Sequence, residues 1–522
     1  MHHNSFIFLY GPPASGKSSL SLGLAKSLQR PFYDLDEMIE ARAGVSIPQI
    51  FTTEGEAGFR QRESAMLTEV LNCDSGVVAL GGGALLRPEN RLLIDGAGPV
   101  LCLSAPFDRI IDRLQTAQGQ RPLLDGDTQT RLLDLLEQRA AHYASFPLQL
   151  DTGDHSPEEA IWQAQMRLGL FHVSSMGVGY DVRVAKDSLD TVGTALQACE
   201  FKGPLGLVSD ENVAGLYADR VMEALRQTGY NTYLASIPAG EQYKTLATVA
   251  RLWEAFLAGG LERGSTVIAL GGGVVGDLAG FAASVYLRGV PWVAAPTSLL
   301  AMVDASLGGK TGADLPQGKN LIGAFHPPSL VLADPQVLAS LPVIELRNGL
   351  AEVVKHGVLA DPVLFELCSR GWETVQENLD EIVRRAMAVK IRVIQEDPYE
   401  RGSRASLNLG HTLGHAIETA SDYRIKHGEA VAIGMVFAAR LSERLGLASP
   451  GLVEAIAATL RSLDLPTDLP PGLDHHRLLS GLRVDKKRSA GKVRWVLPGR
   501  IGEVRWGIEV DEQLVQELTI QP

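Results

Sequence analysis

The sequence has few cysteines, and no recognisable pattern pairs them. Its 522 residues include Cys73, Cys102, Cys199 and Cys368, with no Cys-x-x-Cys pair. This scatter argues against a disulfide framework or a thiolate zinc site, and it fits a reducing compartment. The chain also lacks any apolar run near the roughly 20 residues of a membrane span. Because a strand is expected almost at the N-terminus, no signal peptide fits there, and we expect a cytoplasmic protein.

An excess of positive charge is missing as well. Lys and Arg number 48 against 61 Asp and Glu, which gives a formal net charge of −13. Nucleic acids and anionic membranes are bound by basic surfaces, so we expect neither as a partner. A locally basic pocket for a small anion is compatible with this charge. Because 522 residues exceed what one core usually holds, we expect more than one domain.

What the sequence does have is a long alternation of short apolar runs and helical stretches. The first part predicts strands at Ser5–Tyr10, Val77–Leu80 and Val100–Leu103 and helices at Lys17–Leu28, Arg62–Leu71 and Thr130–Tyr143. After about residue 178 the predicted strands are Tyr180–Val184, Pro204–Ser209, Thr232–Ile237, Thr266–Leu270 and Trp292–Ala295. This rhythm predicts parallel sheets flanked by helices.

Beyond residue 342 the strand signals fade. Residues 345–465 have helical patterns with breaks at Asp361-Pro362, Asp397-Pro398 and Ser449-Pro450, and a strand pair returns at Val493–Leu497 and Glu503–Trp506. We therefore predict an α/β domain with a parallel sheet at residues 1–165 and a linker at 166–177. A second, Rossmann-like α/β domain follows at 178–340, and a mostly helical domain at 341–522.

A phosphate-binding loop (P-loop) follows the first predicted strand. Residues 11–18 read Gly-Pro-Pro-Ala-Ser-Gly-Lys-Ser, which matches G-x-x-x-x-G-K-[ST] between a strand and a helix. The glycines let backbone N–H groups surround phosphates, Lys17 reaches the outer phosphates and Ser18 holds Mg²⁺. We therefore predict a site for ATP with Mg²⁺, formed by Gly11, Gly16, Lys17, Ser18 and Ser19.

Two carboxylates follow at the end of the next predicted strand. If this strand runs through Phe32-Tyr33-Asp34-Leu35-Asp36, its period of two places Asp34 and Asp36 on one face. One carboxylate is then available near Mg²⁺ and the other for a substrate hydroxyl. Alone, the pair is equally well interpreted as a solvated strand end.

Further motifs follow the P-loop in a fixed order. They are Asp34-x-Asp36, Phe59-Arg60, Gly81-Gly82-Gly83, Arg121-Pro122-Leu123-Leu124 and Arg139. In this order, residues 5–165 resemble shikimate kinases. The resemblance implies ATP-dependent phosphorylation of shikimate, with Asp34 near Mg²⁺, Asp36 as the candidate base and Gly82 under the ring. It also implies that Arg60 and Arg139 bind the carboxylate, while Arg121 comes from a lid to the ATP phosphates.

The second half contains another glycine-rich turn and a set of candidate metal ligands. Gly271-Gly-Gly-Val-Val-Gly-Asp277 follows a predicted strand and suits a pyrophosphate, although alone it is a weak signal. His411 and His415 share one helical face, and His427 opens the next helical stretch. Glu352 lies in an apolar segment, where a buried carboxylate needs a partner. Three nitrogen or oxygen ligands with an open position describe a catalytic zinc site.

Basic residues in glycine-rich or apolar surroundings form the third feature of this half. They are Arg288, Lys310, Lys319, Lys355, Lys390 and Arg404. Surface charge is not expected in such surroundings, whereas a doubly anionic substrate would require these side chains.

The motifs of the second half also keep a fixed order. They are Asp210-Glu-Asn212, Pro238-Ala-Gly-Glu-Gln-Tyr-Lys244, Gly271–Asp277, Pro296-Thr-Ser298, Val303-Asp304, Gly308-Gly-Lys310, Lys319-Asn320, Ala351-Glu-Val-Val-Lys355, Asn408-Leu-Gly-His-Thr-Leu-Gly-His415 and His427-Gly-Glu. Across residues 178–510 they resemble 3-dehydroquinate synthases. The resemblance implies NAD- and metal-dependent conversion of 3-deoxy-D-arabino-heptulosonate 7-phosphate to 3-dehydroquinate with release of phosphate. It also implies a homodimer formed through this half.

The same resemblance assigns roles to individual residues. Glu352, His411 and His427 would bind the metal, usually zinc. The residues expected at NAD are Asp210, Glu211, Asn212, Glu241, Lys244, Gly272, Gly273, Asp277, Thr297, Ser298, Asp304 and Lys319. The substrate is expected against Arg288, Asp304, Lys310, Asn320, Lys355, Lys390, Arg404, Asn408 and His415, with one of Lys486 and Lys487 closing the pocket. Those expected to act in catalysis are Lys310, Lys355, Arg404, Asn408 and His415, together with Lys17, Asp36 and Arg121 in the kinase.

Two other functions fit parts of the sequence. A metal-dependent polyol dehydrogenase also combines NAD, histidines and a Gly-Gly-Gly loop, but a neutral polyol would leave the basic residues unpaired. The first half would otherwise be a nucleotide-sensing module, against which Lys17, Asp36, Arg60 and Arg139 argue. Within the metal set, His356 stands where a tyrosine is common, four residues after Glu352, and is a rival ligand.

Overall fold

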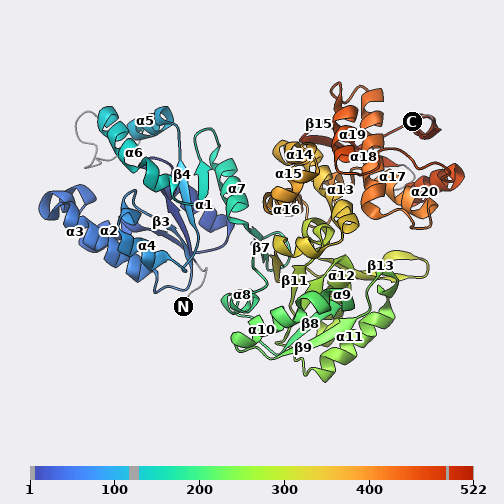
Figure 1. The fold of residues 1–522 in the computed structure, drawn as a ribbon, viewed down its shortest axis with the longest axis horizontal. Coiled ribbons are helices and arrows are strands. Elements are labelled where there is room, and N and C mark those ends of the chain that lie inside the picture. The colour runs from blue at the N-terminus through green and yellow to red at the C-terminus, as the bar shows by residue number, and fades with distance from the viewer. Residues whose placement is uncertain (1–5, 117–127, 489–492, 521–522) are drawn as a thin grey trace. The chain divides into compact units, whose positions relative to one another are not determined.

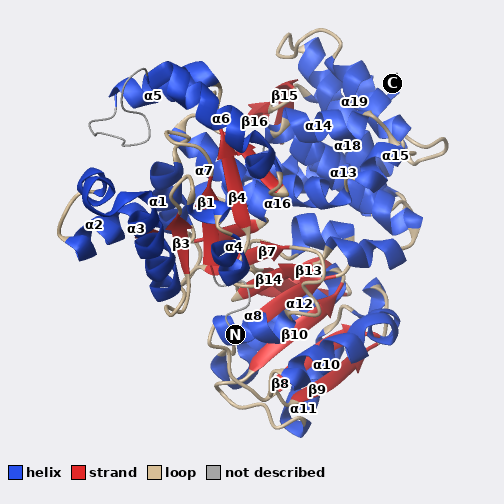
Figure 2. Cartoon of the chain, turned by 60° about the vertical axis from the view of Figure 1, so that its left-hand side comes forward, coloured by secondary structure: helices blue, strands red, loops and turns tan. Residues whose placement is uncertain are grey.

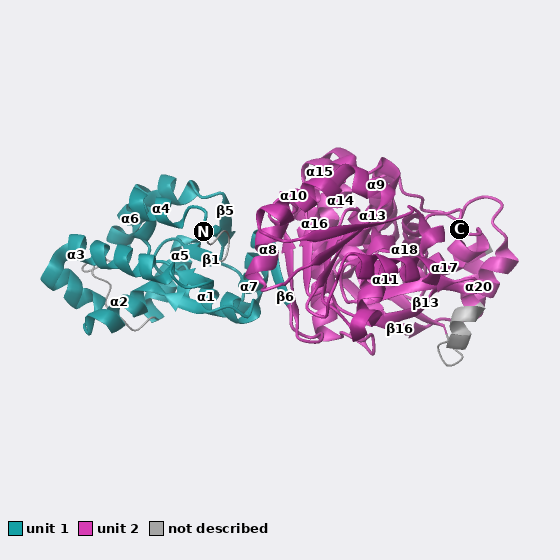
Figure 3. Ribbon diagram, turned by 90° about the horizontal axis from the view of Figure 1, so that it is seen from below, with its two compact units in different colours: residues 1–172 teal, residues 173–522 magenta. Residues whose placement is uncertain are grey.

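The computed structural model describes residues 6–116, 128–488 and 493–520. The chain forms two compact units, residues 1–172 and 173–522 (Figures 1 and 3). Each unit is built around a parallel sheet, as the alternation of strands and helices predicts. None of the described helices is both long and apolar enough to cross a membrane.

The first unit contains a five-stranded parallel sheet with the order β2-β3-β1-β4-β5. The strands are β1 (Phe6–Tyr10), β2 (Phe32–Asp34), β3 (Gly76–Ala79), β4 (Val100–Ser104) and β5 (Leu148–Asp151). The helices are α1 (Lys17–Ser27), α2 (Leu35–Ala43), α3 (Ile47–Val70), α4 (Pro88–Ile94), α5 (Phe107–Thr116), α6 (Thr128–Ala144) and α7 (Pro157–Leu168). Because the strands are parallel, the segments that follow β1, β2 and β3 meet at one edge of the sheet.

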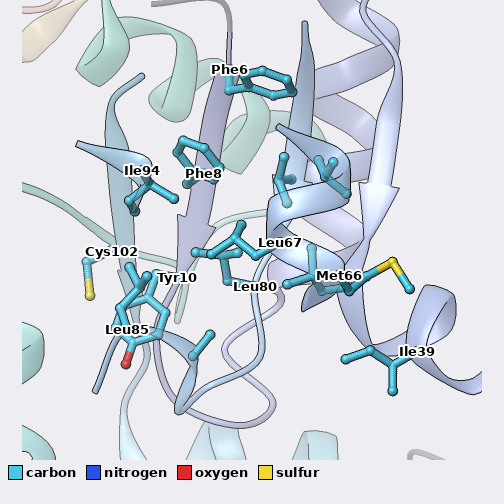
Figure 4. Close-up of a cluster of buried hydrophobic side chains, with 14 of the residues drawn as sticks. Phe6, Phe8, Tyr10, Ile39, Met66, Leu67, Leu80, Leu85, Ile94 and Cys102 are labelled. Carbon is cyan, nitrogen blue, oxygen red and sulfur yellow. The ribbon is translucent and has the colours of Figure 1, made fainter. Parts of the chain in front are cut away.

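The central strand β1 is buried on both faces, which explains its unbroken apolar sequence. Phe6, Phe8 and Tyr10 pack on one face with side chains from α2 and α3 (Figure 4). Ile7 and Leu9 pack on the other face with side chains from α1 and α7. Each fully buried side chain of this size contributes about 1.5–3 kcal/mol, so the two clusters anchor the sheet.

The structure corrects one detail of the sequence analysis at the end of β2. The strand stops at Asp34, and Asp36 lies in the first turn of α2 rather than on the strand. Asp34 is the N-cap of α2: its carboxylate accepts hydrogen bonds from the backbone N–H groups of Asp36 (3.0 Å) and Glu37 (3.3 Å). The period-two argument was therefore wrong, because a capping aspartate starts a helix where the strand pattern seemed to continue.

The sheet of the second unit has the strand order β7-β14-β11-β10-β8-β9. The strands are β7 (Tyr180–Val184), β8 (Leu205–Asp210), β9 (Thr232–Ile237), β10 (Thr266–Gly271), β11 (Trp292–Pro296) and β14 (Leu330–Ala333), and the boundary between the units falls within the preceding strand β6 (Leu170–Val173). The helices of this part are α8 (Val192–Ala198), α9 (Glu211–Val213), α10 (Asp219–Gln227), α11 (Leu246–Ala258) and α12 (Gly273–Val285), with short turns η3 (Ala214–Ala218), η4 (Glu241–Tyr243), η5 (Tyr286–Arg288), η6 (Ala301–Ala305) and η7 (Pro335–Ser340). The predicted strands of this part are thus confirmed.

An antiparallel hairpin, β12 (Lys310–Leu315) with β13 (Gly318–Phe325), was not predicted. Its strands alternate burial only weakly, and β13 is mostly exposed or half-buried. Without a run of buried apolar residues, periodicity gives no strand signal.

The C-terminal part of the second unit is mostly helical, as predicted (Figure 2). It comprises α13 (Val343–Ala360), α14 (Pro362–Ser369), α15 (Trp372–Glu377), α16 (Leu379–Glu396), η8 (Ser403–Asn408), α17 (His411–Ala420), α18 (His427–Arg444), α19 (Leu452–Ser462), α20 (His475–Arg488) and α21 (Glu512–Ile520). The strand pair β15 (Arg494–Arg500) and β16 (Glu503–Glu509) is antiparallel. The predicted breaks are confirmed: Asp361, for example, ends α13 and caps α14 by accepting from Leu364 N at 3.0 Å.

Candidate active sites

The first unit has a cavity of about 730 Å³ formed by segments that follow the strands of its sheet. Elements far apart in the sequence line it, including the P-loop, the start of α2, α3, the glycine loop after β3, and α6. The predicted residues at this cavity are Gly16, Lys17, Ser18, Ser19, Asp34, Asp36, Arg60, Gly82 and Arg139. The structure therefore brings these predicted residues together. Arg121 lies outside the described residues.

The P-loop has a backbone that requires its glycines. Gly11 and Gly16 have φ angles of 136° and 90°, and a Cβ at Gly11 would lie 2.3 Å from the carbonyl oxygen of Leu103. Lys17 Nζ donates to the carbonyl oxygens of Gly11 (3.0 Å) and Pro12 (2.7 Å). The lysine charge is therefore held at the loop, where phosphate groups bind in such a turn.

Arg60 is buried against a carboxylate that the sequence analysis missed. Arg60 Nη1 donates to Glu63 Oε2 at 2.7 Å, and the Glu63 side chain is fully buried. Burial raises the pKa of Glu63, although the Arg60 charge opposes this. Glu63 also lines the cavity. The sequence contained one signal for this pair: Arg60 and Glu63 are three residues apart, and residues with this spacing share one face of a helix.

Two further arginines lie at this cavity. Arg139 Nη1 donates to the carbonyl oxygen of Gly82 at 3.2 Å. Arg113 of α5 was not predicted; its Nη2 donates to the carbonyl oxygen of Thr152 at 2.7 Å, and its Nη1 lies 3.4 Å from that of Ala14. Arg113 thus places a second positive charge beside the P-loop. Nothing in the sequence distinguishes it from other helix arginines.

In the second unit, the predicted NAD residues follow four neighbouring parallel strands. Strands β9, β8, β10 and β11 are adjacent in this order and run in one direction, so their carboxyl ends share one edge of the sheet. The predicted residues that follow these ends are Asp210, Glu211 and Asn212 after β8, Glu241 and Lys244 after β9, Gly272, Gly273 and Asp277 after β10, and Thr297 and Ser298 after β11. Crevices at such an edge bind dinucleotides in open α/β sheets.

Charged side chains connect this edge to the hairpin. Lys244 Nζ lies 2.6 Å from Asp277 Oδ2 and donates to Asn320 Oδ1 at 2.6 Å. Burial raises the pKa of Asp277 to about 6, even with Lys244 beside it. Lys319 Nζ lies 3.4 Å from Glu241 Oε1. The unpredicted hairpin therefore carries Lys319 and Asn320 to the predicted cofactor residues.

Glu352, His411 and His427 form a cluster with the geometry of a metal site. Their ligand atoms all lie within 4.8 Å of one another. Glu352 Oε1 is 3.7 Å from His411 Nε2 and 3.8 Å from His427 Nε2, which is too far for hydrogen bonds. Glu352 is 1% exposed, and its Oε1 has no hydrogen-bond partner among the described residues. A buried acceptor between two imidazole nitrogens fits a bound divalent ion.

The second nitrogen of each histidine in this cluster is held by another group. His411 Nδ1 lies 3.2 Å from the carbonyl oxygen of Leu409, and His427 Nδ1 lies 3.4 Å from Glu418 Oε2. Such contacts fix the tautomer and orientation of metal-binding histidines. Glu418 was not predicted, although it lies on the same helix as His411. The rival ligand His356 is not part of the cluster: it is fully buried, and burial lowers its pKa to about 3.

Several predicted basic residues surround this cluster. Lys355, 1% exposed, forms an ion pair with Glu352, and Lys390 forms one with Asp304 while donating to the Asp304 carbonyl oxygen at 2.7 Å. Burial lowers the pKa of Lys390, although Asp304 opposes this. Asp304 thereby links the segment after β11 to the helical part.

Lys310, Arg404 and Asn408 share a partner that was not predicted. Glu400 forms an ion pair with Lys310. Burial raises the pKa of Glu400, but the charges of Lys310 and Arg404 and a hydrogen bond from Asn408 outweigh burial and lower this pKa below its ordinary value. A Cβ at Gly308 would lie 2.4 Å from Arg404 Nη2, so the glycine turn before Lys310 lies directly on this arginine. The loop from 397 to 402 has no regular pattern that could have predicted Glu400.

Not every predicted substrate residue joins this group. Arg288 is exposed at a turn with φ of 74°, and within the described part of the chain no hydrogen bond or ion pair connects it to the others. The side chains of Lys486 and Lys487 lie outside the described residues. His415 does join: its ring lies 5.4 Å from that of His411, centroid to centroid.

Known proteins match both parts of the chain. The family model of the 3-dehydroquinate synthase N-terminal domain matches residues 234–348, and that of its C-terminal domain matches residues 349–488. The chain is 46% identical over 348 residues to 3-dehydroquinate synthase of Synechococcus sp., which covers 65% of this chain and 95% of the relative. Over 319 residues it is 49% identical to that of Symbiobacterium thermophilum, covering 58% and 89%. The chain belongs to the 3-dehydroquinate synthase family.

A separate match accounts for the N-terminal part of this 3-dehydroquinate synthase. The shikimate kinase family model matches residues 13–168. The predicted fusion is therefore confirmed: the chain joins a shikimate kinase domain to a 3-dehydroquinate synthase. It is a bifunctional enzyme of the shikimate pathway, with a kinase activity and a cyclising phosphate-lyase activity.

Two solved structures share the fold of the synthase part. One is 2-deoxy-scyllo-inosose synthase in complex with carbaglucose-6-phosphate, NAD+ and Co2+; it is 27% identical, with a TM-score of 0.61, and the match covers 67% of this chain and 99% of that one. The other is 2-epi-5-epi-valiolone synthase from Streptomyces hygroscopicus with NAD+ and Zn2+; it is 31% identical, with a TM-score of 0.59 and coverage of 66% and 96%.

Proposed function

We propose that the first unit transfers the terminal phosphoryl group of MgATP to a shikimate hydroxyl in the 730 Å³ cavity. One observation carries the proposal: the P-loop and the guanidinium groups of Arg60 and Arg139 line the same cavity. The P-loop binds a triphosphate through its backbone N–H groups, and the two guanidinium groups suit a carboxylate. Phosphoryl transfer depends mainly on such positioning and on positive charge.

Within this cavity the carboxylates and glycines take separate tasks. Asp36 accepts the proton of the attacking hydroxyl, and Asp34 lies near Mg²⁺. Cβ atoms at Gly81 and Gly83 would lie 2.5 Å from Glu63 Oε1 and 2.3 Å from Arg60 Nη2. Only glycines let the loop approach these groups so closely. The absence of side chains in the loop also leaves room for the substrate ring over Gly82.

We propose that the second unit converts 3-deoxy-D-arabino-heptulosonate 7-phosphate to 3-dehydroquinate, with NAD and a divalent ion, usually zinc, as cofactors. When bound, the metal polarises a substrate hydroxyl and NAD accepts and returns a hydride. Glu352, His411 and His427 hold the metal, since their donor atoms and separations fit one. The residues at the carboxyl ends of β8 to β11 hold the dinucleotide.

The basic residues of this unit select and orient the substrate. Lys310, Arg404 and Asn408 converge on Glu400, so they form a cluster that attracts carboxylate oxygens. Lys355 and Lys390 lie deeper, beside Glu352 and Asp304. A substrate with a phosphate and a carboxylate pairs with these charges, whereas a neutral polyol would leave them unpaired. This cluster beside a metal-ligand set is the observation that favours the synthase over a dehydrogenase.

The amount of product formed per NAD distinguishes these functions. We expect the purified full-length chain, supplied with zinc and less NAD than substrate, to release far more phosphate than the NAD present. NADH absorbance should not accumulate, because the hydride is returned in each cycle. Glucose 6-phosphate, which lacks the carboxylate, serves as the control substrate and should release little phosphate. Product limited to the NAD supplied, with equal NADH, would place this unit among the dehydrogenases.

Removal of the carboxylate behind His427 should weaken metal binding. We expect Glu418→Ala to lower zinc affinity about 10- to 100-fold, the usual loss when such a supporting group is removed, and Glu418→Gln to lower it less. Competition with a chelator measures this constant without any activity assay. Glu454→Gln, which changes an exposed carboxylate on α19, is the matched control. Unchanged zinc affinity in Glu418→Ala would show that His427 needs no support from this side chain.

We also propose a cytoplasmic enzyme that dimerises through its synthase part and acts on small molecules only. Free cysteines suit a reducing compartment, the acidic net charge of −13 suits neither nucleic acids nor anionic lipids, and the dimer is what membership of the 3-dehydroquinate synthase family implies.

A further inference from the structure

Three hydrogen-bond donors converge on one backbone oxygen at the kinase cavity. The carbonyl oxygen of Gly82 accepts from Tyr143 Oη at 2.8 Å, from Arg139 Nη1 at 3.2 Å and from Tyr10 Oη at 3.3 Å. Tyr10 ends β1, whereas Arg139 and Tyr143 lie on α6, one turn apart. A carbonyl oxygen has two lone pairs, so two donors satisfy it and a third is in excess.

The two tyrosines are fixed in place, and Arg139 is the donor that faces the cavity. Tyr10 is fully buried in the cluster of Figure 4, and its ring centroid lies 5.5 Å from that of Tyr143 and 5.2 Å from that of Phe146. Its hydroxyl also lies 3.1 Å from His142 Nε2. Arg139 is half-buried and lines the cavity.

The tyrosine hydroxyls are dependable donors. Burial raises the pKa of both Tyr10 and Tyr143 above the ordinary value. Both therefore keep their protons throughout the physiological pH range. Tyr143 then donates to Gly82 whatever Arg139 does, and Tyr10 donates as well in the tautomer in which His142 Nε2 carries the proton.

We propose that Tyr143 and Tyr10 are positioning residues that hold the Gly82 carbonyl and so free Arg139 to bind the substrate carboxylate. The idea rests on the proposed kinase function. When the carboxylate arrives, Arg139 exchanges a neutral acceptor for a charged one, which is the stronger partner. The exchange costs little, since the Tyr143 hydroxyl still donates to Gly82, with Tyr10 as a second donor in that tautomer of His142. Without them, the same movement would leave a buried acceptor unpaired. Neither Tyr10 nor Tyr143 lines the cavity, so they act through Arg139 and the glycine loop.

The first test separates the two substrates. We expect Tyr143→Phe to raise the KM for shikimate about tenfold, the size of one lost hydrogen bond, and Tyr10→Phe/Tyr143→Phe to raise it further. The KM for ATP should stay within twofold, because the P-loop contacts are untouched. Calorimetric titration of shikimate without ATP should show the same loss of affinity. Tyr33→Phe is the matched control, since its hydroxyl interacts with Cys73 rather than Gly82.

The second test asks whether the effect passes through Arg139. In an Arg139→Gln background, Tyr143→Phe should raise the KM for shikimate by less than twofold, because there is no guanidinium left to release. A tenfold effect in both backgrounds, or equal losses for shikimate and ATP, would show that Tyr143 only supports the fold, and would overturn the proposal. No effect of either tyrosine would overturn it as well. A wild-type chain that does not phosphorylate shikimate would instead remove the proposed function on which it rests.

Discussion

Replacement of Lys17 by Met should abolish the shikimate kinase activity and leave the 3-dehydroquinate synthase activity near normal. Lys17 Nζ lies at the P-loop, 3.0 Å from the Gly11 carbonyl oxygen, and in the proposed function it supplies the charge that meets the outer phosphates. Methionine keeps the length of the side chain and loses this charge. We expect kcat/KM for ATP to fall about 1,000-fold, as when a contact to the developing charge of a transition state is removed. ADP formation with shikimate measures it.

The synthase should be unaffected because each unit has its own sheet and its own buried residues. Lys26→Met is the matched control: Lys26 lies on the same helix, is exposed, and belongs to the last turn, at the end opposite the P-loop. It should leave both activities unchanged. Loss of the synthase activity in a folded Lys17→Met protein would contradict the separation of the two sites.

Much of the fold was predictable because its signals are local. Strands such as Tyr180–Val184 and Thr232–Ile237 have the predicted bounds, and prolines at 362 and 398 end helices where a missing N–H forces it. The P-loop was also predictable, since phosphate binding requires glycines at fixed spacing before a lysine. In each case a short segment contains the whole physical cause of its structure.

What escaped prediction depends on groups that meet only in the folded chain. Glu63, Glu400 and Glu418 are ordinary carboxylates in the sequence, and their importance comes from the cations and imidazoles that tertiary packing brings to them. Asp36 was misplaced because a strand and a helix N-cap compete at Asp34, and the capping hydrogen bonds decide the outcome. The hairpin that carries Lys319 was missed because its side chains are too exposed to show a periodic pattern.

The metal ligands lie between these cases. His411 and His415 were recognisable by their spacing of four, but this spacing equally suits a pair that never binds metal. In the structure, Nε2 of His411 lies 3.7 Å and Nε2 of His427 lies 3.8 Å from Glu352 Oε1, which groups the three residues that the family resemblance implies. His356, four residues after Glu352 on α13, is absent from the cluster.

Replacement of His411 by Ala should therefore remove bound zinc and the synthase activity together, while His356→Ala should keep the metal. His411 supplies one of three protein ligands, and two ligands hold a divalent ion far more weakly than three. His356 is fully buried, so its truncation leaves a cavity and lowers the unfolding temperature without touching the metal shell. Zinc content measured by elemental analysis after dialysis distinguishes the two variants. We expect about one zinc per chain in the wild type and in His356→Ala, and almost none in His411→Ala.

Far-UV circular dichroism and thermal unfolding serve as the folding control for both variants, while the kinase activity, whose residues all belong to the first unit, only checks the amount of intact chain. If His411→Ala retains zinc while His356→Ala loses it, His356 replaces His411 in the ligand set. Two of the ligands, Glu352 and His356, would then come from a single helix, α13. If both variants retain zinc, the metal is held elsewhere in the chain. Loss of synthase activity in His411→Ala with zinc still bound would assign this histidine to the substrate instead, as we expect for His415.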